Sequence, residues 1–279
     1  MTDQTRSGTM VPLQLSYSVV FFYAMNKETK NLCKLCLQEK KLIKAHIIPE
    51  GFVRPLWSGK LAPELHTNSP GKYPKRIPIG VYDPSILCSE CDQKMAPWDD
   101  YAQELFLHQF SDAQVLQLNQ QQVGWRIESF DYRRLKLFFV SVLWRASVSQ
   151  HEFYKRISVG PFEGRLRTMI LDRDPGGSQD FAVILARFGD SDIAAMLDPH
   201  PEKFESVSFI RFYLTGILAY IKVDQRPTPS VFADCRVQES GPLIVLSRRL
   251  HNSRDALVMR DLAESAIAKK RRRSREGTD

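Results

Sequence analysis

Two Cys-x-x-Cys pairs constrain the fold of this chain more than any other feature of its sequence. Cys33 and Cys36 form the first pair, and Cys88 and Cys91 form the second. Each pair can hold one ion from a tight turn, and four thiolates at about 2.3 Å in a tetrahedron are preferred ligands of structural Zn²⁺. Such a site has no open coordination position. The spacing therefore predicts a zinc staple whose binding is coupled to folding of this part of the chain.

The remaining cysteine and the N-terminal residues bear on the redox environment. Cys235 lies alone in "FADCRV", with no sequence feature that would stabilise a thiolate. The apolar stretch 19–25 ("VVFFYAM") is too short to span a bilayer, and it lacks the flanks of a secretory signal. Paired cysteines without such a signal favour metal binding over disulfides. We expect a cytoplasmic protein without a membrane anchor, in which Cys235 has no catalytic role.

Composition changes along the chain and suggests its organisation. Residues 28–100 are rich in Lys, Pro, Cys and Gly, lack long periodic apolar runs, and include a proline-broken loop at 58–80. A segment of this kind is typically held by a metal rather than by a large core. Residues 1–24 are either an optional extension or an N-terminal strand. We predict an N-terminal extension (1–27), a zinc-binding module (28–100), an α+β domain (101–268) and a basic tail (269–279).

Helical periodicity dominates the first part of the α+β domain. One helix is predicted to begin at about residue 99, and another covers 131–149, with Asp131 as its N-cap and one apolar face. A third begins at Pro161, which suits the first position of a helix. A last helix is predicted at about 253–268 and passes into a frayed basic tail.

Short β-rich runs follow in the second half of the chain. They are 181–188, 206–214, 217–223 and 242–247, and Thr215-Gly216 separates two of them as a hairpin turn would. The predicted fold class is therefore α+β: a zinc-stapled module followed by a mixed helix and antiparallel-sheet domain.

Charge suggests a polyanionic partner without identifying one. The chain carries a formal net charge of +7, and 269–279 ("KKRRRSREGTD") holds six Lys or Arg against two acids. Lys72, Lys75 and Arg76 lie in the predicted loop, where such side chains bind phosphates without reading bases. Each of these charges also fits an ordinary solvated surface. We predict DNA contacts at these three residues and in the tail.

His46 is the one histidine close to the first cysteine pair, in "AHIIP" at 45–49. Four sulfurs already complete a zinc site, so His46 is not needed there. Two roles stay open, a packed structural residue and the general base of an active site.

Three stretches in this order, "CKLC", "AHIIP" and "DPSILCSECD", resemble the HNH endonucleases. These are the zinc-stapled branch of the ββα-metal nucleases, also described as His-Me finger or treble-clef-like. The resemblance covers about residues 28–100. It implies a ββα-metal module that hydrolyses DNA phosphodiester bonds with Mg²⁺ or Mn²⁺, and enzymes of this kind often act in defence against foreign DNA.

The resemblance also assigns roles to single residues. His46 falls on the general base, which takes a proton from the attacking water. Asp83 falls where a middle Asn orients that base. Asp92, directly after Cys91, falls on the metal-binding His, and a carboxylate there suits Mg²⁺ or Mn²⁺.

One position departs from the family pattern. Ala45 stands where the family commonly has a metal-binding Asp, and a methyl group ligates nothing. Asp99, Asp100 or Glu104 could supply the missing ligand, or these residues could be capping or solvated carboxylates at a helix start.

Two functional hypotheses follow. The first is a metal-dependent endonuclease, favoured by His46 in its Ile-Ile-Pro context and by Asp83. The second is a non-catalytic zinc-dependent module that binds nucleic acid or protein on a degenerate nuclease fold, favoured by Ala45 and Asp92. The sequence leaves the oligomeric state and the choice between DNA and RNA open.

Overall fold

The computed structural model describes residues 32–67, 72–191 and 195–276. By internal contacts the chain divides into Met1–Lys30 and Asn31–Asp279. The predicted N-terminal extension and its alternative as a strand lie outside the described residues.

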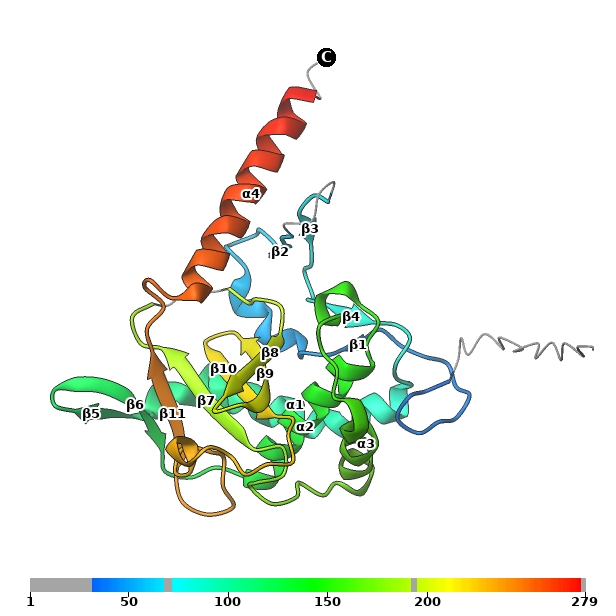
Figure 1. Cartoon of the computed structure of the whole chain (residues 1–279). Coiled ribbons are helices and arrows are strands. Elements are labelled where there is room, and N and C mark those ends of the chain that lie inside the picture. Colours follow the sequence, from blue (N-terminus) through cyan, green and yellow to red (C-terminus); the bar gives the residue numbers. More distant parts are fainter. Residues whose placement is uncertain (1–31, 68–71, 192–194, 277–279) are drawn as a thin grey trace, which may run out of the picture. The chain divides into compact units, whose positions relative to one another are not determined.

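The second unit is a mixed α+β fold around a seven-stranded sheet (Figure 1), which confirms the predicted class. The strand order is β5-β6-β11-β7-β10-β9-β8. Neighbouring strands are antiparallel, as predicted, except β11 and β7, which run parallel. The long proline-containing connection from β10 to β11 allows β11 to return beside β7 in the same direction. The strands are β5 (Gln114–Leu118), β6 (Gln121–Ile127), β7 (Val183–Phe188), β8 (His200–Phe204), β9 (Val207–Leu214), β10 (Ile217–Lys222) and β11 (Leu243–Arg248).

Four of these strands were predicted and three were not. The four β-rich runs form β7, β9, β10 and β11, and Thr215-Gly216 makes the turn between β9 and β10. The missed strands β5, β6 and β8 lack a continuous β-branched or aromatic pattern, because β5 and β6 are rich in glutamine and β8 contains proline and charges. Two of them, β5 and β8, are the edges of the sheet. Pairing with an inner strand, rather than local preference, makes them strands.

Helix α2 (Tyr132–Val148) lies at the centre of the unit. As predicted, the Asp131 carboxylate caps it by accepting a hydrogen bond of 2.9 Å from the Arg134 backbone N–H. Every residue from Leu135 to Ala146 is buried, which exceeds the single apolar face expected from the sequence. The reason is that α2 contacts α1 (Ser89–Gln103), α3 (Glu163–Asp172) and the core that covers one face of the sheet.

The region of residues 32–100 has little regular structure besides α1. Its strands have two residues each: β1 (Ala45–His46) pairs with β4 (Tyr82–Asp83), and β2 (Glu64–Leu65) pairs with β3 (Lys75–Arg76). Its buried side chains, such as Ile47 and Phe52, belong to the same hydrophobic cluster as those of α2 and the sheet. The two predicted modules therefore share one core.

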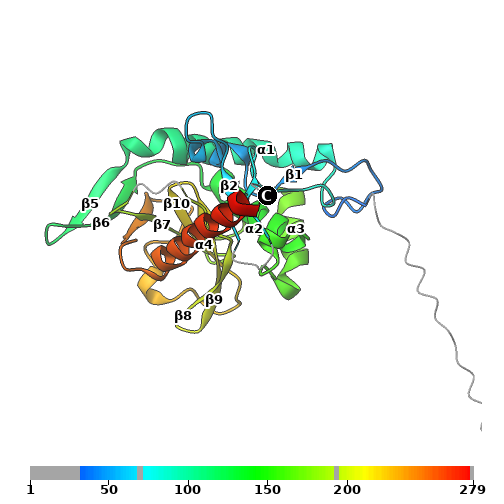
Figure 2. The same cartoon turned by 90° about the horizontal axis from the view of Figure 1, so that it is seen from above.

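Helix α4 (Arg254–Glu276) covers the opposite face of the sheet, where Met259 and Leu262 pack on a second cluster. It continues through Glu276, although the sequence predicted a frayed tail after 268. Contacts explain the difference, because Lys269 Nζ donates to the Thr67 carbonyl at 2.6 Å and Lys270 Nζ donates to the Glu64 carboxylate at 2.8 Å. Figures 1 and 2 show α4 leaving the sheet on the side of β2 and β3.

The helices offer no candidate for a membrane span. None within the described residues combines the length and the apolar character that crossing a bilayer requires.

Candidate metal centre and its neighbourhood

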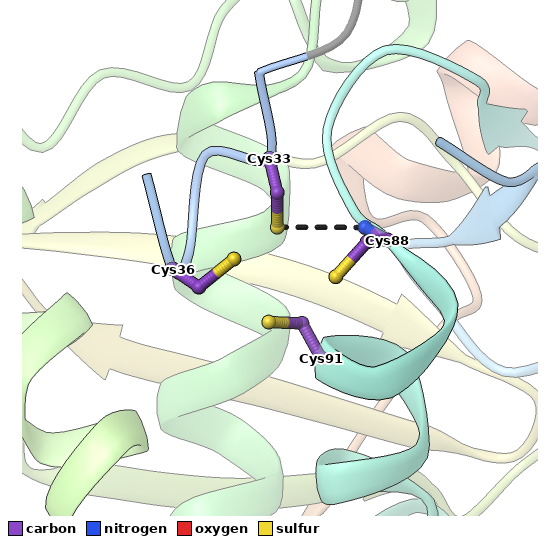
Figure 3. Close-up of side chains that lie close together, drawn as sticks. All are labelled: Cys33, Cys36, Cys88 and Cys91. Atoms are coloured by element: carbon purple, nitrogen blue, oxygen red, sulfur yellow. Dashed lines mark hydrogen bonds between the residues drawn. The ribbon is translucent and has the colours of Figure 1, made fainter. Parts of the chain in front are cut away.

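The four paired cysteines come together as predicted (Figure 3). Their sulfur atoms all lie within 4.8 Å of one another. Four sulfurs at about 2.3 Å from a tetrahedral ion are about 3.8 Å apart, so this cluster is close to that arrangement. Three of the cysteines are buried and Cys36 is half-buried. The cluster can hold a metal ion such as zinc.

Backbone hydrogen bonds bring the two pairs together. Cys33 and Cys36 lie in a turn closed by the Leu37 N–H, which donates to the Cys33 carbonyl at 2.8 Å. Cys88 is the N-cap of α1, and Cys91 lies in the first turn of that helix. The Cys88 N–H donates to Cys33 Sγ at 3.4 Å, which joins the two pairs directly (Figure 3). The backbone itself therefore arranges much of the cluster.

The pKa values of the clustered thiols indicate how they would respond to a bound cation. Burial raises the pKa of Cys33, but backbone hydrogen bonds lower it more, to about 7. Burial raises the pKa of Cys88 and of Cys91 above the usual value for a thiol. Since metal-bound cysteines are thiolates, binding of a divalent cation would release protons here. Cys235 is not part of the cluster, and burial raises the pKa of its thiol.

No second group of metal ligands is assembled elsewhere in the described ranges. The four cysteines are the one set there of three or more His, Cys, Asp or Glu side chains close enough to share an ion. Asp92, the predicted ligand of Mg²⁺ or Mn²⁺, is therefore not part of a group of three or more His, Cys, Asp or Glu ligands among the described residues.

His46 is half-buried on β1, opposite Tyr82, whose ring it meets edge-on at 6.1 Å between centroids. Its Nε2 atom is buried without a hydrogen-bond partner among the described residues. Burial lowers the pKa of the imidazole, against the opposing effects of Glu50, a backbone hydrogen bond with Ile79, and Asp92. The ring is therefore neutral at pH 7, and one of its nitrogens is free to accept a proton.

Asp83 lies on β4 opposite Ala45 and is 3% exposed. Its Oδ1 accepts hydrogen bonds from the Ser85 N–H and hydroxyl at 2.8 and 2.6 Å. Its Oδ2 accepts from the Ser149 hydroxyl and the Gln150 N–H, both at 2.8 Å. Burial raises the pKa of this carboxyl, but the four hydrogen bonds lower it more. None of them comes from His46, so Asp83 fastens β4 to the end of α2, and its role in orienting the base stays a prediction.

Arg145 is a residue of this neighbourhood to which the sequence assigned no role. Its fully buried guanidinium donates to both carboxylate oxygens of Asp99, at 2.9 and 2.7 Å. It also donates to the His46 carbonyl at 2.9 Å. Asp99 is thus an ion-pair partner, not a solvated carboxylate. An arginine in a helix of mostly apolar residues was the hint in the sequence, because unpaired charges are rarely buried.

Asp92 lies on α1 and is half-buried. Burial raises the pKa of its carboxyl, while the Arg145 guanidinium and the protonated form of His46 act to lower it. Asp92 therefore lies within electrostatic reach of the imidazole, and its role as a metal ligand stays a prediction.

The predicted phosphate-contact residues lie at the surface. Lys75 and Arg76 form β3 and are exposed, and Lys72 pairs with Glu152. Because Lys270 of α4 pairs with Glu64 of β2 and Lys269 donates to Thr67 just after β2, the basic loop and the basic C-terminal segment are neighbours, although they are far apart in the sequence.

Comparison of the chain with protein families, with curated protein sequences and with solved structures finds no match.

Proposed function

We propose that this protein is a zinc-stapled, metal-dependent endonuclease that hydrolyses DNA phosphodiester bonds with His46 as general base. The observation that carries this proposal is the His46 imidazole, which is neutral at pH 7, whose buried Nε2 has no partner among the described residues, and which lies within electrostatic reach of Asp92. The order of β1, β4 and α1, with Cys88 and Cys91 at the start of the helix, is the order that a ββα-metal module requires.

The chemistry needs an activated water, a cation near the phosphate and a rigid frame. The free nitrogen of His46 can take the proton of the water, because the lowered pKa keeps the ring unprotonated. Asp92 is the candidate ligand for Mg²⁺ or Mn²⁺, which would stabilise the negative charge that develops on the phosphate oxygens.

The frame around His46 consists of three connections. The Ile43 N–H donates to the Leu87 carbonyl at 2.9 Å, which ties the segment before β1 to the residue before Cys88. Arg145 holds the His46 carbonyl from α2. A zinc ion at the cysteines would fix the first cysteine pair relative to α1. Such fixation suits a base that must be held within hydrogen-bond distance of its water.

The surface charges support a nucleic-acid substrate. Lys75 and Arg76 on β3 are neighbours of a helix whose last turns carry Lys269, Lys270, Arg271 and Arg272. Lysine and arginine side chains in such a cluster bind the phosphate backbone without reading bases.

A second function is favoured by specific observations, namely a non-catalytic zinc-dependent nucleic-acid-binding module on the same fold. Ala45 is 1% exposed and has no atom that could ligate a metal. Both carboxylate oxygens of Asp83 already accept hydrogen bonds from Ser85, Ser149 and Gln150. The described residues hold no second group of three metal ligands.

Plasmid cleavage separates the two functions. The full-length protein, with Mg²⁺ or Mn²⁺, is expected to nick supercoiled plasmid, and His46→Ala is expected to lower the rate about 100-fold or more. The control is His108→Ala, because His108 is exposed and lies outside the site. Since the pKa of His46 lies below its usual value, the rate should be on its plateau at pH 7 and should fall only at lower pH.

Each outcome has a defined meaning. Cleavage that persists in a zinc-loaded, folded His46→Ala protein contradicts the role of His46. Absence of cleavage with either cation, together with plasmid binding in a gel-shift assay, supports the binding module instead.

A further inference from the structure

Strand β5 is an open edge of the seven-stranded sheet. It pairs with β6 on one side, and it is the last strand of the sheet among the described residues. Figures 1 and 2 show the β5–β6 hairpin extending away from the rest of the unit. Val115, Leu118 and Val123 on this hairpin are 47%, 64% and 40% exposed. Backbone N–H and C=O groups on the outer side of β5 are therefore available for pairing with another strand.

The opposite edge of the same sheet is protected in a way that β5 is not. Strand β8 contains Pro201, which has no N–H to donate, and the charged residues Glu202 and Lys203. Proline and charged side chains are the usual means by which proteins prevent edge-to-edge association. Residues 113–125 contain neither a proline nor a charged residue. The absence of these devices at β5 marks this edge as one that can be used for association.

The outer side of β5 is also regular. The register between β5 and β6 shifts where Leu116 opposes Gly124 and Gln117 opposes Gln122, so the extra residue, Val123, is on β6. A bulge on the edge strand itself would twist its outer side and weaken pairing. Here the bulge is on the inner strand, and the five residues of β5 stay evenly spaced.

We propose that β5 pairs antiparallel with β5 of a second copy of this chain and so joins two sheets across a twofold axis. In an antiparallel pair related by a twofold axis, residue i of one copy faces residue j of the other and residue j faces residue i. The uncharged side chains of β5 therefore face uncharged side chains of the second β5. The glutamine side chains of β5 suit this pairing because an amide both donates and accepts. Because residues 113–125 carry no charged side chain, two copies of this basic chain can meet at β5 without bringing like charges into the contact.

The size of β5 sets the strength of this association. Pairing of a five-residue strand with its own copy, together with packing of the exposed valine and leucine side chains, buries less than about 1,200 Å², which is typical of weak interfaces. The dimer should therefore dissociate reversibly on dilution. It should also be strengthened by salt, which screens the repulsion between two basic chains.

Sedimentation velocity of the full-length protein over a range of concentrations tests the proposal. We expect the average mass to rise with concentration from 32.1 kDa towards twice that value. The variant Val115→Lys/Leu118→Lys should weaken association at least tenfold, because like charges would face each other across the twofold axis. Both side chains are exposed, so the variant should keep the melting temperature of the parent to within a few degrees.

A matched control and three outcomes make the test decisive. Val231→Lys changes a valine that is 66% exposed and lies outside the sheet, and it should associate like the parent chain. A parent chain that stays monomeric at every concentration overturns the proposal. Association of the double variant as strong as that of the parent overturns it as well. So does a mass that keeps rising beyond two copies, because an edge that pairs with itself closes at two.

Discussion

The cysteine-rich region, residues 32–100, and the seven-stranded sheet are held together in different ways. In the first region the strands have two residues each, and single groups such as the cysteine cluster, Asp83 and Arg145 connect the segments. In the sheet, longer strands pack apolar side chains on both faces. A region that depends on a few polar or metal contacts is sensitive to single substitutions, whereas a continuous apolar core distributes its stability over many residues.

Loss of the cysteine cluster should have the largest effect on stability. Cys88→Ser removes one of four sulfur ligands, so we expect the purified protein to lose its zinc and to lose more than about 4 kcal/mol of unfolding free energy. Cys235→Ser, outside the cluster, should keep its zinc and change stability by no more than about 1 kcal/mol. Metal analysis and urea unfolding measure both. Retention of one zinc per chain and of parental stability in Cys88→Ser would be incompatible with a four-sulfur site.

Arg145 connects the two regions, and its removal should have the next largest effect. Arg145→Met leaves the Asp99 carboxylate without its partner and frees the His46 carbonyl, which should cost about 3–5 kcal/mol. Arg165→Met breaks an exposed pair with Asp180 and should cost less than about 1 kcal/mol. Urea unfolding of both variants gives the comparison. Equal costs would show that burial does not distinguish the two ion pairs.

The double variant Asp99→Asn/Arg145→Met sharpens this result. Because it removes both charges of the buried pair, we expect it to be more stable than Arg145→Met alone. If the double variant loses as much unfolding free energy as Asp99→Asn and Arg145→Met lose together, the two charges act independently.

Replacement of Lys136, which is on α2 in the core beneath the sheet, should have the smallest effect on stability, and that effect should be a gain and not a loss. It is fully buried on α2, and its Nζ donates to the Phe181 carbonyl at 3.0 Å. Burial lowers the pKa of this lysine to about 7. The folded protein thus gives up this proton near pH 7, whereas the unfolded chain keeps it up to its ordinary pKa of about 10.4. Stability from this group rises with pH across that interval.

Lys136→Met should therefore be about 1–3 kcal/mol more stable than the parent at pH 7, and the gain should shrink at pH 9.5. Lys203→Met, on exposed strand β8, should show no such gain. Thermal unfolding at the two pH values measures the difference. A gain that does not change with pH would contradict the titration of Lys136.

Local features of the sequence determined a substantial part of this structure. The spacing of the two cysteine pairs was enough to predict that they come together, because four sulfur ligands in two short motifs specify a metal-binding cluster. Asp131 predicted the start of α2, and the β-rich runs predicted β7, β9, β10 and β11, because caps and periodicity are properties of neighbouring residues.

Only the tertiary structure decided the partners of residues whose local sequence is ambiguous. Asp99 resembles any solvated carboxylate until Arg145 reaches it from another helix, and Asp83 is committed by Ser149 and Gln150 at the end of α2. The basic segment after residue 268 becomes helical beside Thr67 and Glu64, and β5 becomes a strand by pairing with β6. In each case the stabilising group lies outside the local segment, so neither periodicity nor composition of that segment records it.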